Sequence, residues 1–139
     1  MKDRLFLDTN VMFDLLGERA PFYDTAAKVA TLADKGKVEI VVSALSYSTV
    51  HYLLSKYEKE DVVMEKLRKF KTVSTVSDLS DTIIDKGLSS AFSDFEDALQ
   101  YYCALQSNCN ILITRNGKDF KFSELPVLTG EEYLKSLEI

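Results

Sequence analysis

Short runs rich in apolar and β-branched residues alternate along this chain with longer segments of helical periodicity, and this alternation constrains its fold most strongly. The short runs lie at residues 4–7, 38–42, 72–76, 111–114 and 127–128. Strands that alternate with helices form right-handed βαβ units, in which the strands of the sheet are parallel. The sequence therefore predicts an α/β fold, a three-layer α/β/α sandwich with a mostly parallel central sheet.

Capping residues predict where several helices begin. Ser43 follows the second short run, and two pairs with capping-box spacing occur later, Ser93 with Glu96 and Thr129 with Glu132. In a capping box the first side chain accepts a hydrogen bond from the backbone N–H three residues on, and the glutamate accepts one in return. We therefore expect helices after each of these residues, including a long one that runs from the first box to about residue 106.

Length and composition predict one globular domain. The chain has 139 residues, which suits a single domain over residues 1–139, and its 46% hydrophobic and 28% charged content is typical of globular proteins. No apolar stretch approaches the roughly 20 residues of a membrane span, and the amino terminus does not resemble a secretory signal. We expect a cytoplasmic protein without membrane contact, whose Cys103 and Cys109 are reduced thiols.

The charge balance argues against a protein that holds nucleic acid by a general basic surface. The chain has 17 lysine and arginine residues against 22 aspartate and glutamate residues, which gives a formal net charge of -5. A nuclease remains compatible with this balance, because a metal ion bound among acidic residues inverts the local field that an approaching phosphate meets.

Four aspartates lie where predicted elements begin or end. Asp8 follows the first apolar run, Asp94 and Asp97 open the long helix, and Asp119 follows the run at residues 111–114. Residues just past the carboxyl ends of parallel strands share one edge of the sheet, so these acids can converge there. Carboxylates held together repel one another, and a divalent cation such as Mg²⁺ relieves that repulsion. The sequence therefore predicts a metal site at this edge.

Several motifs in this order resemble the PIN domain. They are Asp8-Thr9-Asn10 followed by Val11, the DFEDALQ segment at residues 94–100, Thr114-Arg115-Asn116, and Asp119-Phe120. The resemblance covers nearly the whole chain. Within the superfamily, DFEDALQ together with the last two elements resembles the bacterial branch related to VapC-type toxins.

The resemblance implies a metal-dependent endoribonuclease that uses Mg²⁺ or Mn²⁺ to hydrolyse RNA phosphodiester bonds. It also implies a homodimer and a small antitoxin partner, as in toxin–antitoxin pairs. Asp8 matches the first acid of the family, Asp97 the acid of the long helix, and Asp119 the last site element. With Asp94 one turn before Asp97, these four residues are the expected catalytic and metal-binding set.

Five further residues are candidates for contact with the RNA substrate. Thr9 could orient Asp8 or a phosphate, while Arg115 and Lys118 could neutralise phosphate charge. Asn10 and Asn116 would be neutral contacts beside the acids.

Some of these side chains have an equally ordinary structural interpretation. A carboxylate at position 94 is favourable at a helix amino terminus even without a metal, and Arg115 could instead form a structural salt bridge. We assign Glu96 to the capping box rather than to the metal. His51, the only histidine, lies on an apolar-striped helix and is interpreted as structural.

One departure from the family pattern leaves an alternative open. Many VapC-type toxins carry an acid six residues after the serine that begins the third helix, and here that position is Thr49. The chain could therefore bind one metal rather than two, or be a catalytically weak scaffold that binds RNA or a partner. A phosphatase-like α/β hydrolase is a third hypothesis, but it would need an acid where this chain has Asn10.

Overall fold

The computed structural model of the protein describes residues 1–138. Its sheet consists of β1 (Asp3–Leu7), β2 (Val38–Ser43), β3 (Ser74–Ser77), β4 (Ile111–Ile113) and β5 (Val127–Leu128). The strand order is β3-β2-β1-β4-β5, and every neighbouring pair is parallel. Strand β1 therefore lies at the centre, and the prediction of a parallel sheet is confirmed.

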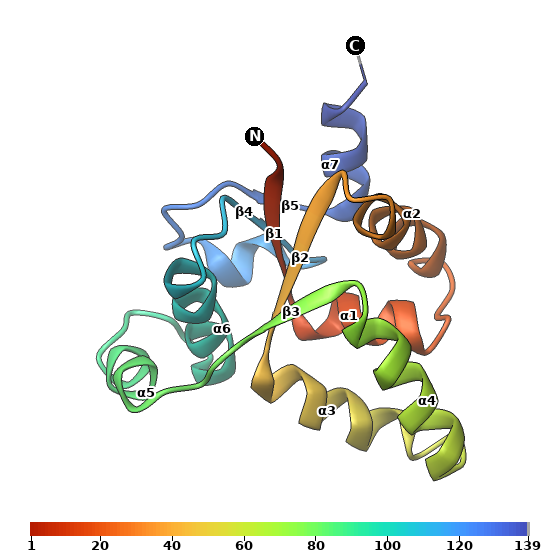
Figure 1. The fold of residues 1–139 in the computed structure, drawn as a ribbon. Coiled ribbons are helices and arrows are strands. Elements are labelled where there is room, and N and C mark those ends of the chain that lie inside the picture. Colours follow the sequence, from red (N-terminus) through yellow and green to blue (C-terminus); the bar gives the residue numbers. More distant parts are fainter. Residues whose placement is uncertain (139) are drawn as a thin grey trace.

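Helices cover both faces of this sheet (Figure 1). They are α1 (Thr9–Leu16), α2 (Tyr23–Asp34), α3 (Ala44–Leu54), α4 (Glu60–Lys71), α5 (Asp81–Leu88), α6 (Phe95–Gln106) and α7 (Gly130–Ser136), and a short 3-10 helix, η1 (Gly117–Phe120), follows β4. Helices α1 to α4 and α7 pack on one face, and α5 and α6 pack on the other. This is the predicted three-layer α/β/α sandwich.

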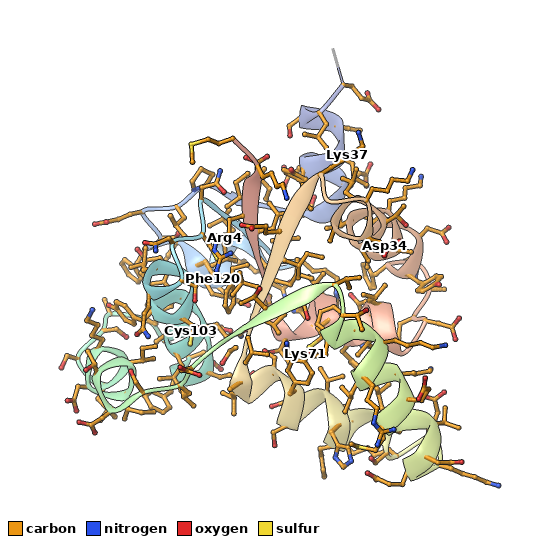
Figure 2. The ribbon with its side chains drawn as sticks, viewed as in Figure 1. Arg4, Asp34, Lys37, Lys71, Cys103 and Phe120 are labelled. Atoms are coloured by element: carbon orange, nitrogen blue, oxygen red, sulfur yellow. The ribbon has the colours of Figure 1, made fainter. Side chains whose placement is uncertain are left out.

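The central strand contributes to the core on both faces. Successive side chains of a strand point to opposite sides, so Leu5 and Leu7 belong to the larger core while Phe6 belongs to the core beneath α6. Cys103 and Phe120, which share that second core, lie on the α6 side of the sheet in Figure 2. Because β1 is buried on both faces, its carboxyl end is a rigid position from which to present a functional residue.

One capping box is confirmed and the other is wrong. The box at the start of α7 is present. At α6, however, the N-cap is Asp94, whose Oδ1 accepts a hydrogen bond from the backbone N–H of Asp97 at 3.0 Å. Aspartate caps a helix as well as serine does, and its charge also interacts favourably with the helix dipole, so Asp94 takes the place predicted for Ser93. The Glu96 side chain is thereby free of the cap.

Two further expectations concern the cysteines and the membrane. Cys103 and Cys109 are free and buried, and burial raises the pKa of the Cys109 thiol to about 12, so this thiol is unreactive near neutral pH. No helix within residues 1–138 is long and apolar enough to cross a membrane.

Candidate functional site

Asp8 occupies the position just past β1, at the carboxyl edge of the sheet. Its backbone N–H donates to the carbonyl oxygen of Ile113 at 2.9 Å, which continues the pairing with β4. Its carboxylate is buried and accepts one hydrogen bond at each oxygen, from Gln100 Nε2 to Oδ1 at 2.9 Å and from Thr114 Oγ1 to Oδ2 at 2.7 Å. Each oxygen keeps a second lone pair for another ligand.

A buried polar network continues from Asp8 toward α3. Gln100 Oε1 accepts hydrogen bonds from the Thr9 backbone N–H at 2.8 Å and from Thr9 Oγ1 at 3.1 Å. The Thr9 hydroxyl also shares a 2.7 Å hydrogen bond with Ser46 Oγ. Thr9 is buried, and both of its polar groups are used inside the protein, so its predicted contact with substrate stays a prediction.

The predicted acids lie close enough together for their charges to affect the pKa values of Asp97 and Asp8. The pKa of Asp97 is raised to about 7, first by burial and then by the negative charges of Asp94, Asp8, Asp119 and Glu96. Burial also raises the pKa of Asp8, where the hydrogen bonds from its neighbours partly offset the effect. Asp8 at the end of β1, the first turn of α6 and Asp119 in η1 thus contribute to one acidic group, although Asp8 lies more than 80 positions before the others along the chain.

Glu96 also belongs to this acidic group. The sequence analysis did not predict this, because it assigned Glu96 to a capping box. Its pKa is raised by burial and then by the charges of Asp94 and Asp8, while the Thr9 hydroxyl lowers it. The sequence offers one signal for this role, because Asp94 and Ser93 can both cap α6. When Asp94 is the N-cap, Glu96 no longer has the capping-box position, and its carboxylate is available for another role.

The chemistry of this group fits a hard divalent cation, but its side chains do not yet form a coordination shell. Within residues 1–138, no three His, Cys, Asp or Glu side chains are gathered closely enough to hold an ion as they stand. The neighbouring negative charges contribute to the raised pKa of Asp97, and a cation would relieve this repulsion. Oxygen ligands alone, without histidine or thiolate, suit Mg²⁺ or Mn²⁺. Metal ligation by the four aspartates stays a prediction.

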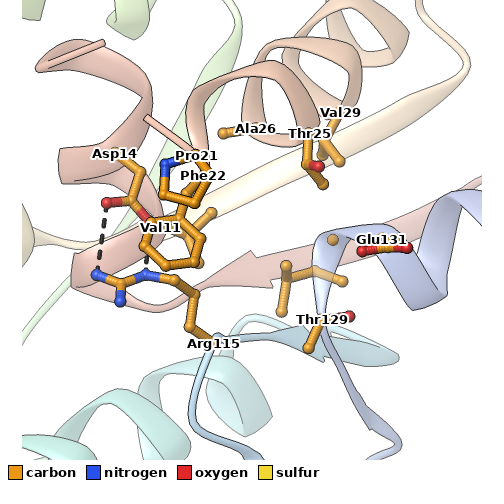
Figure 3. A pocket seen from close by; sticks show the side chains of 12 residues that line it. Val11, Asp14, Pro21, Phe22, Thr25, Ala26, Val29, Arg115, Thr129 and Glu131 are labelled. Carbon is orange, nitrogen blue, oxygen red and sulfur yellow. Dashed lines mark hydrogen bonds and ion pairs between the residues drawn. The ribbon is translucent and has the colours of Figure 1, made fainter. Parts of the chain in front are cut away.

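Arg115 forms a salt bridge beside this acidic group. Its Nε donates to Asp14 Oδ2 at 2.7 Å, and its guanidinium carbon lies 4.2 Å from the centre of the Phe22 ring (Figure 3). Asp14 is only 2% exposed and is also 3.5 Å from Arg19. The structural salt bridge that the sequence analysis considered for Arg115 is therefore formed, with Asp14 as its partner. A role in phosphate binding stays a prediction.

The buried charge of Asp14 was not predicted from the sequence. It lies in α1 among apolar residues, where the helical pattern predicts only core packing. Burial raises its pKa, and the two arginines partly offset that effect. A partner on another segment is visible only once the fold brings Arg115 next to α1.

A cavity of about 310 Å³ lies beside the salt bridge (Figure 3). Side chains of α1, α2, β4 and the start of α7 line it, and Val11, Phe22 and Val29 make much of its wall apolar. Asp14 and Arg115 lie at its edge, and none of the four predicted site aspartates lines it.

The remaining candidates lie on the loop after β4 and at the start of α1. Asn116, Lys118 and Asp119 are exposed, and the Asn116 N–H donates to Thr114 Oγ1 at 3.1 Å. This hydrogen bond connects the loop to the threonine that holds Asp8. The Oδ1 of Asn10 is a buried oxygen without a hydrogen-bond partner in the described residues, so it could accept one from a bound molecule.

Helix α3 contains Thr49, which occupies the position of the family acid, and His51, the single histidine. Thr49 is half-buried and supplies no carboxylate. The ring of His51 contacts Glu60 of α4, with Nε2 2.8 Å from Oε1, which agrees with the structural role predicted for this histidine.

Comparison with known proteins gives one family and a consistent fold. The sequence model of the PIN domain family matches residues 4–118. Ribonuclease VapC1 of Aquifex aeolicus (strain VF5) is 25% identical over 136 residues, which cover 94% of this chain and 93% of that protein.

Solved structures agree with this result at the level of the fold. A toxin–antitoxin complex from Klebsiella pneumoniae contains a chain that matches with a TM-score of 0.67 and 23% identity, over 91% of this chain and 97% of that one. VapBC2 from Rickettsia felis, bound to a DNA fragment from its promoter, matches with a TM-score of 0.64 and 21% identity, over 90% and 96% of the two chains.

Proposed function

Because the chain belongs to the PIN domain family, we propose that it is a metal-dependent endoribonuclease that hydrolyses RNA phosphodiester bonds as the toxin of a toxin–antitoxin pair. The observation that carries this proposal is the acidic group around Asp8. Burial and then the charges of Asp94, Asp8, Asp119 and Glu96 raise the pKa of Asp97 to about 7, so five carboxylates lie near one another here. Crowding of this kind costs stability, and functional sites are where proteins accept such a cost.

The proposed metal ligands are Asp8 and Asp97, together with Asp94 and Asp119. When bound, Mg²⁺ or Mn²⁺ supplies Lewis-acid activation of water and stabilises charge on the leaving oxygen. Asp8 presents a carboxylate whose orientation is set by Gln100 and Thr114. Asp97 holds a proton below about pH 7 and releases it above, so its ionised form is available for ligation near neutral pH.

No other set of side chains in the described residues offers an alternative catalytic centre. The single histidine, His51, pairs with Glu60 on the outer helices, which excludes a histidine-dependent triad at the acids. Both cysteines are buried in the second core, and burial raises the pKa of each thiol, which disfavours the reactive thiolate. The acids alone would therefore carry the reaction.

We also propose a small antitoxin as the partner, a homodimer as the assembly and the cytoplasm as the location. The proposal of an antitoxin partner is supported by the Klebsiella pneumoniae structure, which is a toxin–antitoxin complex containing a chain of the same fold.

A second candidate function is a PIN scaffold that binds RNA or a partner with little catalysis. The observation that favours it is Thr49, which offers no carboxylate where many relatives have one. The two functions differ in whether the acids are needed for turnover, so they can be separated by experiment.

The test is RNA cleavage by three purified proteins on a mixed pool of structured RNAs with Mn²⁺. The change Asp8→Asn preserves shape and removes the charge that would hold the cation, so it should abolish cleavage without unfolding the chain. Asp85→Asn, an exposed change of equal charge on α5, is the matched control and should cleave like the parent. Cleavage that persists in Asp8→Asn would disprove the assignment, and an inert parent would favour the scaffold.

A further inference from the structure

Gln100 is a buried polar side chain in α6 whose hydrogen-bond partners all lie at the proposed site. It is 1% exposed and lies one turn after Asp97. Its amide accepts from Thr9 and donates to Asp8, so its hydrogen bonds connect the end of β1, the start of α1 and the helix that carries two of the acids. No other buried side chain in the described residues connects these three elements through Asp8.

The orientation of this amide is fixed by its surroundings. The Thr9 backbone N–H can only donate, so Gln100 Oε1 must face it. Gln100 Nε2 must then face Asp8 Oδ1, which is an acceptor when Asp8 is ionised. The Thr9 hydroxyl, held in turn by Ser46, stabilises the same arrangement.

The Asp8 carboxylate is thereby held at both ends. Gln100 donates to Oδ1 and Thr114 donates to Oδ2, which restricts rotation of the group and leaves one lone pair on each oxygen for another ligand. Partners of this kind orient the ligands of metal sites, and removing one typically weakens metal affinity or activity by about 10- to 100-fold.

We propose that Gln100 is a positioning residue, which holds the Asp8 carboxylate in the orientation that receives the cation and keeps α6 in register with it. This inference rests on the metal site of the proposed function.

The length and the amide chemistry of the glutamine side chain are both needed for this role. Methionine would leave the Thr9 N–H and one Asp8 oxygen without this partner, asparagine is one methylene shorter, and glutamate would lack the donor and add a charge beside Asp8.

A purely structural role for Gln100 makes a different prediction. If the amide only joins α6 to α1, its loss should lower the melting temperature and leave the Mn²⁺ affinity of the folded protein unchanged. If it acts through Asp8, its loss should weaken Mn²⁺ binding in a protein that is still folded.

The experiment compares Gln100→Met with the parent by calorimetric titration with Mn²⁺, after circular dichroism has shown that each protein is folded. We expect about 10- to 100-fold weaker binding. Tyr101→Phe is the matched control: it removes one hydrogen bond of α6, from the Glu124 N–H to the Tyr101 hydroxyl, without contact with Asp8, and should bind Mn²⁺ like the parent. If Gln100→Met does not fold, Gln100→Asn keeps the amide with a shorter reach, and the same loss is expected.

The double variant Asp8→Asn with Gln100→Met shows whether Gln100 acts through Asp8. It should bind Mn²⁺ no more weakly than Asp8→Asn alone. A folded Gln100 variant within twofold of the parent, while Asp8→Asn binds much more weakly, would overturn the role of Gln100 and leave the metal site intact. Equal Mn²⁺ binding by the parent and Asp8→Asn would overturn the metal site, and the role of Gln100 with it.

Discussion

Removing the charge of Asp97 should stabilise the protein when no metal is bound. Burial and neighbouring carboxylates raise its pKa from 3.8 to about 7, so the folded state keeps a proton that the unfolded state releases. The stability contributed by this group is therefore lost as the pH rises from about 4 to about 7. A raised pKa of this size corresponds to at most about 4 kcal/mol. Solvent screening at this half-buried position lowers the effect to about 1–2 kcal/mol.

The assay is thermal unfolding of Asp97→Asn and the parent in EDTA. At about pH 8 the variant should melt roughly 3–8 °C higher, because a change of 1 kcal/mol shifts the melting temperature of a domain this size by a few degrees. At about pH 5 the gain should shrink, since the parent carboxyl is then already mostly protonated. Asp85→Asn, exposed on α5, should show neither the gain nor its pH dependence.

Addition of Mn²⁺ should reverse the order of the two proteins. A cation that binds only the folded state raises the melting temperature by mass action, and the parent has the carboxylate that the variant lacks. An Asp97→Asn variant that melts below the parent in EDTA at about pH 8 would refute the crowding of these acids. So would a gain of equal size at both pH values.

Two further substitutions test other parts of the account. Thr49→Glu should tighten Mn²⁺ binding and raise RNA cleavage, because it restores the acid that many VapC-type toxins carry; a folded variant with unchanged Mn²⁺ affinity would show that position 49 does not face the metal. Arg115→Leu should lower the stability by about 3 kcal/mol, because it leaves the buried Asp14 carboxylate with Arg19 alone. Thermal unfolding beside the exposed Lys118→Leu control measures this, and equal losses in both variants would contradict a buried salt bridge.

The sheet could be predicted from the sequence because its signals are local. The run that forms β1 is apolar at every buried position, and even the two-residue β5 is recognisable between its turn and the capping box of α7. The start of α6 was harder, because several adjacent polar residues can each cap a helix. Asp94 prevailed over Ser93, and only the structure shows which one faces the free N–H groups.

The site was predicted less completely, because its contacts join distant segments. The four aspartates could be named from their positions at the ends of elements. Glu96, Asp14 and Gln100 could not, because each has an ordinary local interpretation as a capping, helical or motif residue. Their partners lie across the fold: Arg115 is 101 positions from Asp14, and Asp8 is 92 positions from Gln100.

The most direct test of the central claim is a crystal structure of the protein soaked in Mn²⁺, recorded with anomalous scattering. We predict one strong peak among the carboxylates of Asp8, Asp94, Asp97 and Asp119, with Asp8 still held by Gln100 and Thr114. The side chains of α6 should have turned toward the ion, since carboxylates that repel one another are drawn together by a cation. Ordered carboxylates with no peak among them, or a peak only elsewhere on the molecule, would contradict the claim that these acids form a metal site.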